Sequence, residues 1–226
     1  MKAFIIGDKN NAMSAALMDK CIKSSNIPIE IFQQTSPETL KEHKRPFGVM
    51  AWNYPMNEAF GIDHETKIVL RPYRTNNSDK TFACTISHAR LWQKCIELNE
   101  EIMILEHDAL FTRKFEPFDW DGGVLGLNDP RGATWKSLEY HKKVSATKGV
   151  KDTPWIVNKS ETLQGLAGNS AYIIKPNFAK KVLDKLKDKG GWPNDTLMCR
   201  QYFPNEIKVV YPYYTIVQKH HSTTVL

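Results

Sequence analysis

Lys2-Ala3-Phe4-Ile5-Ile6, with its apolar run from Ala3 to Ile6, predicts a short buried strand, and the polar turn Gly7-Asp8-Lys9-Asn10 follows it at once. From Ala12 to Ile22, small and apolar residues recur near one face at the 3.6-residue spacing of a helix. Pro28 ends this helix because proline disfavours helical geometry in the residue before it, and Ile29 to Phe32 then predicts a second strand. A strand, a helix and a strand within about 30 residues form a βαβ unit, which predicts a parallel sheet in an α/β fold.

Helices and strands continue to alternate along the chain. The pattern predicts a helix over Cys84 to Asn99 and a fully buried strand over Ile102 to Leu105. It also predicts a lysine-rich helix after Lys175-Pro176 and shorter strands at Lys67 to Leu70, Gly123 to Leu127, Tyr172 to Ile174 and Ile207 to Tyr211. Because no linker rich in Gly, Pro and Ser interrupts this alternation, we expect one domain over residues 1–226.

Ala133 to Gln164 is the exception to this pattern. The stretch is polar and basic, shows little periodicity, and carries Trp135, Tyr140 and Trp155 among many lysines. Loops of this length in compact domains are usually functional lids or inserts. We therefore predict a long loop or lid over residues 133–164.

The composition is that of a globular protein with a basic excess. Of 226 residues, 41% are hydrophobic, and 31 Lys and Arg against 25 Asp and Glu give a formal net charge of +6. Such an excess suits an anionic partner, for example a nucleotide, a phosphorylated glycan, a nucleic acid or an acidic membrane surface. No apolar run approaches the ~20 residues that span a bilayer, and the start of the chain does not resemble a secretory signal. Four scattered cysteines predict reduced thiols in a cytoplasmic protein, with neither a zinc site nor a disulfide framework.

Two carboxylates stand where the predicted strand over Ile102 to Leu105 runs out. In an extended chain, residues i and i+2 point to the same side, so Glu106 and Asp108 should converge. Two convergent carboxylates attract a hard divalent cation such as Mg²⁺ or Mn²⁺, which in turn neutralises a diphosphate. This arrangement suits an enzyme whose leaving group is a nucleoside diphosphate. An ordinary polar strand terminus is the alternative interpretation.

Two histidines lie near these carboxylates. The same alternation turns His107 to the opposite side, which favours a packing or surface role over that of a third metal ligand. His88 lies near the predicted start of the preceding helix, where Ser87 or Thr85 would be the cap and the helix N–H groups would favour an anion. A purely structural role for His88 is the alternative.

Three segments of the sequence, in this order along the chain, resemble known motifs. They are Ala83-Cys84-Thr85-Ile86-Ser87-His88 with Trp92, then Ile104-Leu105-Glu106-His107-Asp108-Ala109, then Gly165 to Ile174 with Pro193-Asn194-Asp195. Together they resemble the motif blocks of glycosyltransferase family 25, the enzymes of lipooligosaccharide biosynthesis and their relatives. The resemblance covers residues 80–126 and 163–213, with a looser match over the first βαβ unit. His107 departs from the family's middle Asp, and Lys9 is the only cation in a turn that is usually rich in Arg.

The resemblance implies a GT-A-like fold, which is a Rossmann-related α/β sandwich with a mostly parallel central sheet. It also implies inverting transfer of a sugar from a nucleotide sugar, most often UDP-linked, to an acceptor hydroxyl. Asp108 would then coordinate Mn²⁺ or Mg²⁺ at the diphosphate, and Glu106 would assist through the ribose or a metal-bound water. Lys9, Ser87 and His88 are further candidates for donor binding.

An inverting displacement also needs a base opposite the leaving group, to remove the proton of the acceptor. Asp195, in Trp192-Pro193-Asn194-Asp195, is the candidate, and the alternative is an N-cap for a helix starting at Thr196. Trp192 would stack on a sugar or a nucleobase, unless it is simply packed.

We expect two other polar stretches of the sequence to lie near the donor. Asn128-Asp129-Pro130-Arg131 follows a predicted strand, so that Asn128 and Asp129 would receive substrate hydroxyls while Arg131 would pair with phosphate. A plain turn explains this stretch equally well. His220 or His221 of the C-terminal tail would be a third metal ligand, as in some GT-A enzymes.

The leading prediction is a metal-dependent glycosyltransferase that acts on an anionic glycan or lipooligosaccharide, with Trp135, Trp155 and Trp192 on the acceptor side. A phage-type enzyme that modifies a hydroxylated DNA base is the first alternative, because aromatic residues interleave with lysines between Trp135 and Lys159. A non-catalytic homologue that binds a nucleotide or a glycan is the second. We expect the protein in the cytoplasm (of the host, if it is viral) or at the inner membrane surface.

Overall fold

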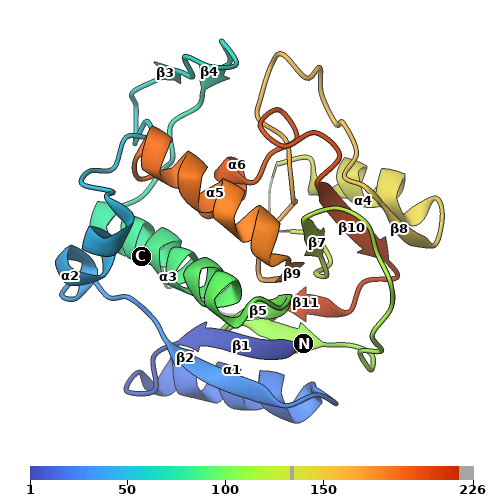
Figure 1. Ribbon diagram of the computed structural model, residues 1–226. Coiled ribbons are helices and arrows are strands. Elements are labelled where there is room, and N and C mark those ends of the chain that lie inside the picture. Colours follow the sequence, from blue (N-terminus) through green and yellow to red (C-terminus); the bar gives the residue numbers. More distant parts are fainter. Residues whose placement is uncertain (133–134, 219–226) are drawn as a thin grey trace.

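The opening βαβ unit is confirmed in the computed structural model, which describes residues 1–132 and 135–218 (Figure 1). Strand β1 (Lys2–Gly7) pairs in parallel with β2 (Ile29–Gln33), and helix α1 (Ala12–Ser24) connects them. The side chain of Asn11 caps α1 by accepting a hydrogen bond from the backbone N–H of Ser14 at 3.0 Å. The polar turn after β1 therefore lies at the carboxyl edge of the sheet.

A seven-stranded sheet forms the centre of the fold, in the order β2-β1-β5-β9-β7-β10-β8. Strands β1, β2, β5, β7 and β10 run in one direction, whereas β8 and β9 run in the other. The bounds of the added strands are β5 (Ile102–Glu106), β7 (Val124–Gly126), β8 (Gly149–Asp152), β9 (Ala171–Ile174) and β10 (Ile207–Tyr211). The predicted α/β sandwich with a mostly parallel sheet is confirmed.

Strand β9 runs against its neighbours β5 and β7, with Ile104 opposite Tyr172 and Leu105 opposite Ala171. Alternation of helices and strands gives no sign of this reversal. Its consequence is that the amino end of β9 adjoins the carboxyl ends of β5 and β7. Residues 168–170, which lead into β9, therefore meet the end of β5.

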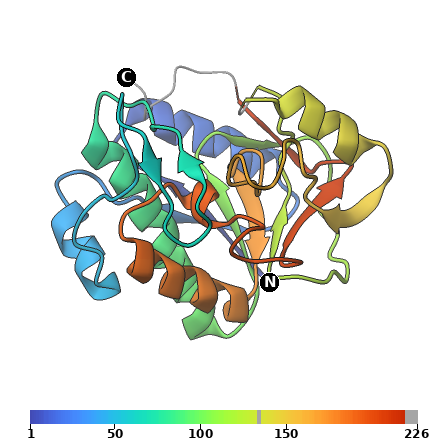
Figure 2. The same cartoon turned by 90° about the horizontal axis from the view of Figure 1, so that it is seen from above.

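Helices cover both faces of the sheet (Figure 2). Helices α3 (Ser78–Leu98) and α5 (Pro176–Lys189) pack on one face, while α1 packs on the other. Successive residues of a strand point to opposite faces, so Ile104 joins the core under α3 and α5 and Leu105 joins the core under α1. Burial on both faces explains why β1 and β5 are almost continuously apolar.

Helix α3 begins earlier than the sequence predicts, and the predicted caps are wrong. Asn77 is the N-cap, and its side chain accepts from the backbone N–H of Lys80 at 2.9 Å. Thr85 and Ser87 lie inside the helix, where their hydroxyls donate to the carbonyls of Trp192 (2.8 Å) and Ala83 (2.9 Å). A Ser or Thr is tolerated in the middle of a helix when its hydroxyl donates to a carbonyl. Thr85 and Ser87 therefore do not indicate where α3 begins.

The predicted long loop over residues 133–164 is wrong in part. It contains α4 (Ser137–Ser145), and β8 extends the central sheet by pairing antiparallel with β10. Tyr140 and Val144, one helical turn apart, bury α4 against Val209 and Tyr213. Two buried apolar residues are too few to give a helical period, and β8 is a half-exposed, polar edge strand.

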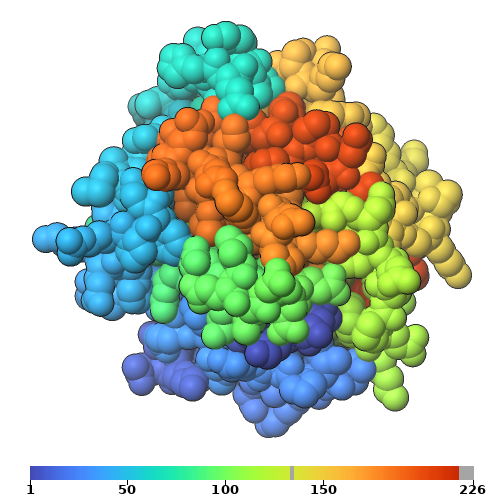
Figure 3. All heavy atoms as spheres, viewed as in Figure 1, coloured from blue at the N-terminus to red at the C-terminus, as the bar shows by residue number. Residues whose placement is uncertain are grey.

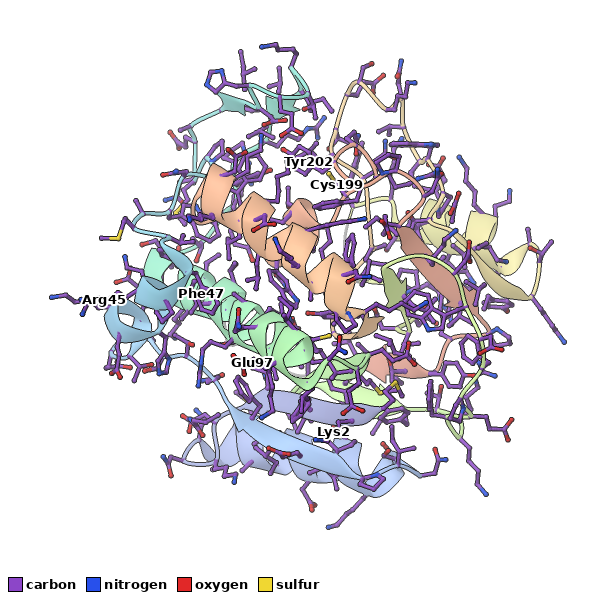
Figure 4. The ribbon with its side chains drawn as sticks, in the orientation of Figure 1. Lys2, Arg45, Phe47, Glu97, Cys199 and Tyr202 are labelled. Atoms are coloured by element: carbon purple, nitrogen blue, oxygen red, sulfur yellow. The ribbon has the colours of Figure 1, made fainter. Side chains whose placement is uncertain are left out.

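The remaining elements are short: α2 (Leu40–Lys44), η1 (Arg45–Phe47), β3 (Gly61–Ile62), β4 (Val69–Leu70), β6 (Ala109–Phe111), α6 (Asn194–Leu197) and β11 (Thr215–Val217). The β3–β4 hairpin projects beside one end of α5 (Figure 3). Lys189 holds it there through ion pairs with Asp63 (2.7 Å) and Glu65 (2.9 Å). Figure 4 shows Tyr202 near this end of α5, and its ring centroid lies 4.9 Å from Lys189 Nζ.

All four cysteines are free thiols, as predicted, and all but Cys84 are buried. Within residues 1–132 and 135–218, no helix is both long enough and apolar enough to cross a bilayer.

Candidate functional site

A cavity of about 430 Å³ opens where β5 ends. The ends of β1 and β2, one face of α3, the turn after β5, the residues before β9 and the start of α6 all contribute to its wall. Among its lining residues are Thr35, Tyr73, Lys80, Cys84, Ser87, His88, Glu106, His107, Asp108, Asn169, Ser170, Asn194 and Asp195. The structure thus brings five predicted residues together: Ser87, His88, Glu106, Asp108 and Asp195.

Glu106 is the last residue of β5 and is held from two sides. Its backbone N–H donates to the carbonyl of Ser170 at 2.8 Å, and its Oε1 lies 3.2 Å from Nε2 of the fully buried His88. Loss of hydration opposes ionisation of Glu106, but the hydrogen bond from His88 and the electrostatic influence of the His88 and His107 rings outweigh it. The pKa of Glu106 is therefore lowered, and the carboxylate is ionised at neutral pH.

The turn after β5 places Asp108 and His107 in the wall of the same cavity as Glu106. The prediction that His107 points to the opposite side is wrong, because β5 ends at Glu106 and strand alternation does not continue into the turn. The C-terminal tail returns to this turn, where the backbone N–H of Gln218 donates to the carbonyl of Asp108 at 2.8 Å. His220 and His221 lie outside the described residues.

Asp195 lies in the first turn of α6 and is exposed to the cavity. Helix α6 begins at Asn194 with Pro193 as its N-cap, so the alternative role of Asp195 as a helix cap is wrong. The Thr85 hydroxyl holds this segment against α3 through the Trp192 carbonyl. The surrounding protein reduces the hydration of the carboxylate and Glu106 repels it, and together these effects raise the pKa of Asp195 above its usual value.

Cys84, His88 and Glu106 form a cluster that the sequence analysis did not single out as a unit. One ligand atom from each lies within 4.8 Å of the others. Cys84 and His88 are four residues apart on α3, and this i, i+4 spacing is the signal that would have paired them. Burial, with negative charge on Glu106, Asp195 and Asp108, raises the pKa of the Cys84 thiol, so Cys84 is protonated.

Three buried polar residues complete the cavity wall. Among the described residues, the side chains of Asn169 and Ser170 and the Nδ2 of Asn194 have no hydrogen-bond partner. These residues are 7%, 4% and 8% exposed. Because buried polar groups are normally hydrogen-bonded, a polar ligand or water is needed to satisfy them.

The other predicted donor-side residues do not line this cavity. Lys9 is exposed in the turn after β1. Asn128 and Asp129 are buried after β7, where Asp129 forms a 2.6 Å ion pair with Arg131. This pairing lowers the pKa of Asp129 although burial opposes it, and a paired Arg131 is less available to a phosphate.

The three tryptophans predicted on the acceptor side have different environments. Trp192 is buried in the core, with its ring edge-on to Tyr54. Trp155 packs under Arg200, and exposed Trp135 packs under Arg71, whose guanidinium carbon lies 5.1 Å from the ring centroid.

A second, more open groove of about 940 Å³ borders the cavity along residues 71–76. It is lined by Asn57, Glu58, Phe60, Arg71, Pro72, Arg74, Thr75 and Asn76, and the intervening Tyr73 lines the cavity. Within the described parts of the chain, neither Arg71 nor Arg74 forms an ion pair, and both side chains are exposed.

Comparison with solved structures gives two examples of distant similarity. The apo structure of the bifunctional glycosyltransferase WbbM is 13% identical with a TM-score of 0.44, and the match covers 93% of this chain. The chain spans only 38% of the WbbM chain. Apo mouse xyloside xylosyltransferase 1 is 10% identical with a TM-score of 0.43, and the match covers 90% of this chain and 82% of the mouse chain.

Comparison with curated proteins gives no match. Among protein families, the model of glycosyltransferase family 25, described as LPS biosynthesis protein, matches residues 1–120. That match covers β1, α3 and β5 and includes Glu106, Asp108 and the α3 wall of the cavity, whereas Asp195 lies outside it. Because more than half of the chain matches, this protein belongs to glycosyltransferase family 25.

Proposed function

We propose that the protein transfers a sugar from a nucleotide-sugar donor to a hydroxyl of an anionic glycan, with inversion, and that a divalent cation assists. The observation that carries this proposal is the gathering of Glu106, Asp108 and Asp195 around one cavity at the carboxyl edge of the sheet. Ligands of open α/β sheets bind at this edge. The enzyme class follows from the family, so the proposal concerns the donor, the metal and the acceptor.

The residues of the cavity fit a hard divalent cation. Glu106 and Asp108 supply carboxylate oxygens, the ligands that Mn²⁺ and Mg²⁺ prefer. The lowered pKa of Glu106 means that it needs no proton release before binding. A bound cation would neutralise the negative charge of the leaving diphosphate. The metal ligands that we propose are Asp108 and Glu106; a contribution from His220 is a matter for mutagenesis.

The donor's polar groups match the polar wall of the cavity. Asn169, Ser170 and Asn194 carry buried polar atoms without partners in the described structure, next to the carboxylates. Hydroxyls of a sugar or a ribose both donate and accept hydrogen bonds, which is what amide and hydroxyl side chains need. A UDP-linked sugar is the donor that we propose.

Asp195 is the base that we propose for the acceptor. Its raised pKa makes the carboxylate a stronger proton acceptor than an ordinary aspartate. Glu106, whose pKa is lowered, stays ionised on the donor side. In this proposal, the different environments of the two carboxylates give them different roles: Asp195 accepts a proton, and Glu106 stays ionised.

The open groove along residues 71–76 is the acceptor site that we propose. Arg71 and Arg74 form no ion pair with the residues that the structure describes, and guanidinium groups bind phosphate or carboxylate through paired hydrogen bonds. Trp135, beside Arg71, offers a ring face for a sugar. The family's description refers to LPS biosynthesis, and a phosphorylated or acidic glycan suits both observations. No comparison supports a DNA acceptor, which remains an outcome of the test.

The test begins with thermal shifts for a panel of nucleotide sugars, each with Mn²⁺ or with EDTA. The best donor is then incubated with a phosphorylated oligosaccharide, its dephosphorylated counterpart and duplex DNA containing 5-hydroxymethylcytosine, and the products are analysed by mass spectrometry. We expect Mn²⁺-dependent stabilisation by a UDP-sugar and transfer to the phosphorylated oligosaccharide. Transfer to the DNA alone, or stabilisation that is equal in EDTA, would contradict the proposal.

A further inference from the structure

A buried chain of hydrogen bonds runs from the core to the carboxylate of Glu106. Trp92 Nε1 lies 2.9 Å from the hydroxyl of Tyr172, this hydroxyl lies 2.8 Å from His88 Nδ1, and His88 Nε2 lies 3.2 Å from Glu106 Oε1. Trp92, Tyr172 and His88 are each 0% exposed. We propose that this relay fixes the tautomer of His88 and thereby holds Glu106 in its working orientation.

The direction of the relay follows from counting donors and acceptors. The indole of Trp92 can only donate, so the oxygen of Tyr172 accepts from it. Tyr172 has one hydrogen left to donate, and His88 Nδ1 is its acceptor among the described residues. A histidine that accepts at Nδ1 carries its hydrogen on Nε2, and Nε2–H then donates to Glu106. Every polar atom of the relay is satisfied in this arrangement only.

The opposite tautomer leaves a buried group unsatisfied. With hydrogen on His88 Nδ1, the Tyr172 oxygen would accept two hydrogen bonds, one from Trp92 and one from His88. The Tyr172 hydroxyl hydrogen would then have no acceptor in the described structure. A buried donor without an acceptor costs folding free energy. A metal ion bound by Cys84, His88 and Glu106 would require that tautomer, because it would occupy Nε2. The relay therefore favours His88 as a hydrogen-bond donor to Glu106 over His88 as a metal ligand.

The backbone restrains the same residues. Tyr172 stands opposite Ile104, two residues before Glu106, and the ring of His88 stacks on that of Tyr172 at 5.7 Å with 21° between the planes. His88 and Trp92 are one helical turn apart on α3. Oε1 is held by His88, Oε2 accepts no hydrogen bond from the described residues, and Glu106 lines the cavity. Tyr172 and Trp92 are thus positioning residues, because they act on the cavity only through His88 and Glu106.

The tautomer of His88 is measurable without any knowledge of the reaction. Long-range ¹H–¹⁵N correlation spectra of the unmodified protein, labelled at histidine, distinguish Nδ1–H from Nε2–H, and a His88→Gln variant assigns the signal. We expect hydrogen on Nε2 and none on Nδ1. Hydrogen on Nδ1 in the unmodified protein would overturn the relay, and this measurement does not depend on whether any variant folds.

The consequence for catalysis rests on the proposed function and is tested by Tyr172→Phe. This variant removes the hydroxyl that fixes Nδ1, so we expect mixed tautomers and a 10–100-fold weaker apparent affinity for Mn²⁺ in UDP-sugar turnover, with the acceptor KM unchanged. Tyr213→Phe is the matched control, because its hydroxyl lies 3.3 Å from Nδ1 of His141, away from the cavity. We expect this control to turn over like the unmodified protein.

The possible failures can be told apart. An unmodified protein that turns over no UDP-sugar, but shows the Nε2–H tautomer, would refute the proposed function and leave the relay standing. A Tyr172→Phe variant that keeps the Nε2–H tautomer, or that binds Mn²⁺ as tightly as the Tyr213→Phe control, would refute the relay. If Tyr172→Phe does not fold, Trp92→Phe replaces it, since loss of the indole donor removes the constraint on the direction of the relay.

Discussion

Replacing Asp195 by Asn separates catalysis from stability. The substitution keeps the size of the side chain and an oxygen for the Thr196 hydroxyl, which lies 3.4 Å from Oδ1. It removes the charge that Glu106 repels and that is incompletely hydrated. Because folding raises the pKa of Asp195, its ionised form opposes folding at pH values above both the folded and the unfolded pKa. We therefore expect the free energy of unfolding at pH 7.5 to stay the same or to rise.

Catalysis should respond in the opposite direction. Loss of a general base lowers rates by about 10²–10⁴-fold, which corresponds to about 2.7–5.4 kcal/mol in the activation free energy. The assay is release of UDP from the best UDP-sugar with saturating acceptor and Mn²⁺, alongside urea unfolding of the same samples. Binding of UDP with Mn²⁺ should not weaken, since Asp195 is assigned to the acceptor.

A matched control is Asp184→Asn, which removes an exposed carboxylate of α5 that pairs with Lys180 at 2.8 Å. This control should leave both turnover and UDP binding unchanged. An Asp195→Asn variant that retains more than a tenth of kcat would refute the assignment of the base. A variant that loses activity together with stability would show that Asp195 supports the fold instead.

Three further predictions concern the metal, the acceptor groove and the hairpin. Asp108→Asn should weaken Mn²⁺-dependent binding of UDP by more than about tenfold in calorimetry, and unchanged binding would exclude Asp108 as a ligand. Arg74→Ala should raise the KM for an anionic acceptor by about tenfold, because one charge-assisted hydrogen bond is lost, and it should not change UDP binding. An equal rise in the KM for a neutral acceptor would argue against recognition of charge. Lys189→Met should lower the free energy of unfolding by about 3–5 kcal/mol at pH 7, because Asp63, with only 1% of its side chain exposed, loses its main partner. Burial opposes ionisation of Asp63, but hydrogen bonds from Lys189 and Thr66 outweigh it and lower its pKa. Its contribution to stability is therefore complete above the unfolded pKa and is lost as the pH falls through the folded pKa, so urea titrations at low pH should show the variant and the unmodified protein converging.

The apolar strands were predictable because they are buried on both faces. The runs Ala3 to Ile6 and Ile102 to Leu105 give β1 and β5 almost residue for residue, and with β5 comes the position of Glu106. The polar residues that follow a buried strand at the carboxyl edge could be assigned to a site by the same logic. Glu106 and Asp108 do line the cavity; Ser87, His88 and Asp195 line it too, but they were candidates from a predicted helix start and from the family resemblance, not from the strand pattern.

The rest depends on contacts between distant parts of the chain. The reversal of β9 places Tyr172 against Ile104 and under His88, and no local pattern records that pairing. His107 lines the cavity because β5 ends at Glu106, so that strand alternation does not continue into the turn. Helix α4 is held by contacts of Tyr140 and Val144 with residues that lie more than 60 positions later, so its own sequence resembles a loop.

The most direct test of the account is a calorimetric titration of UDP into the unmodified protein with Mn²⁺ and again with EDTA. Glu106 and Asp108 supply the negative charge next to the proposed diphosphate site, and two carboxylates repel an anion unless a cation lies between them. We predict binding that requires Mn²⁺ and that Asp108→Ala abolishes. Binding of equal strength in EDTA, or binding that Asp108→Ala leaves intact, would contradict it.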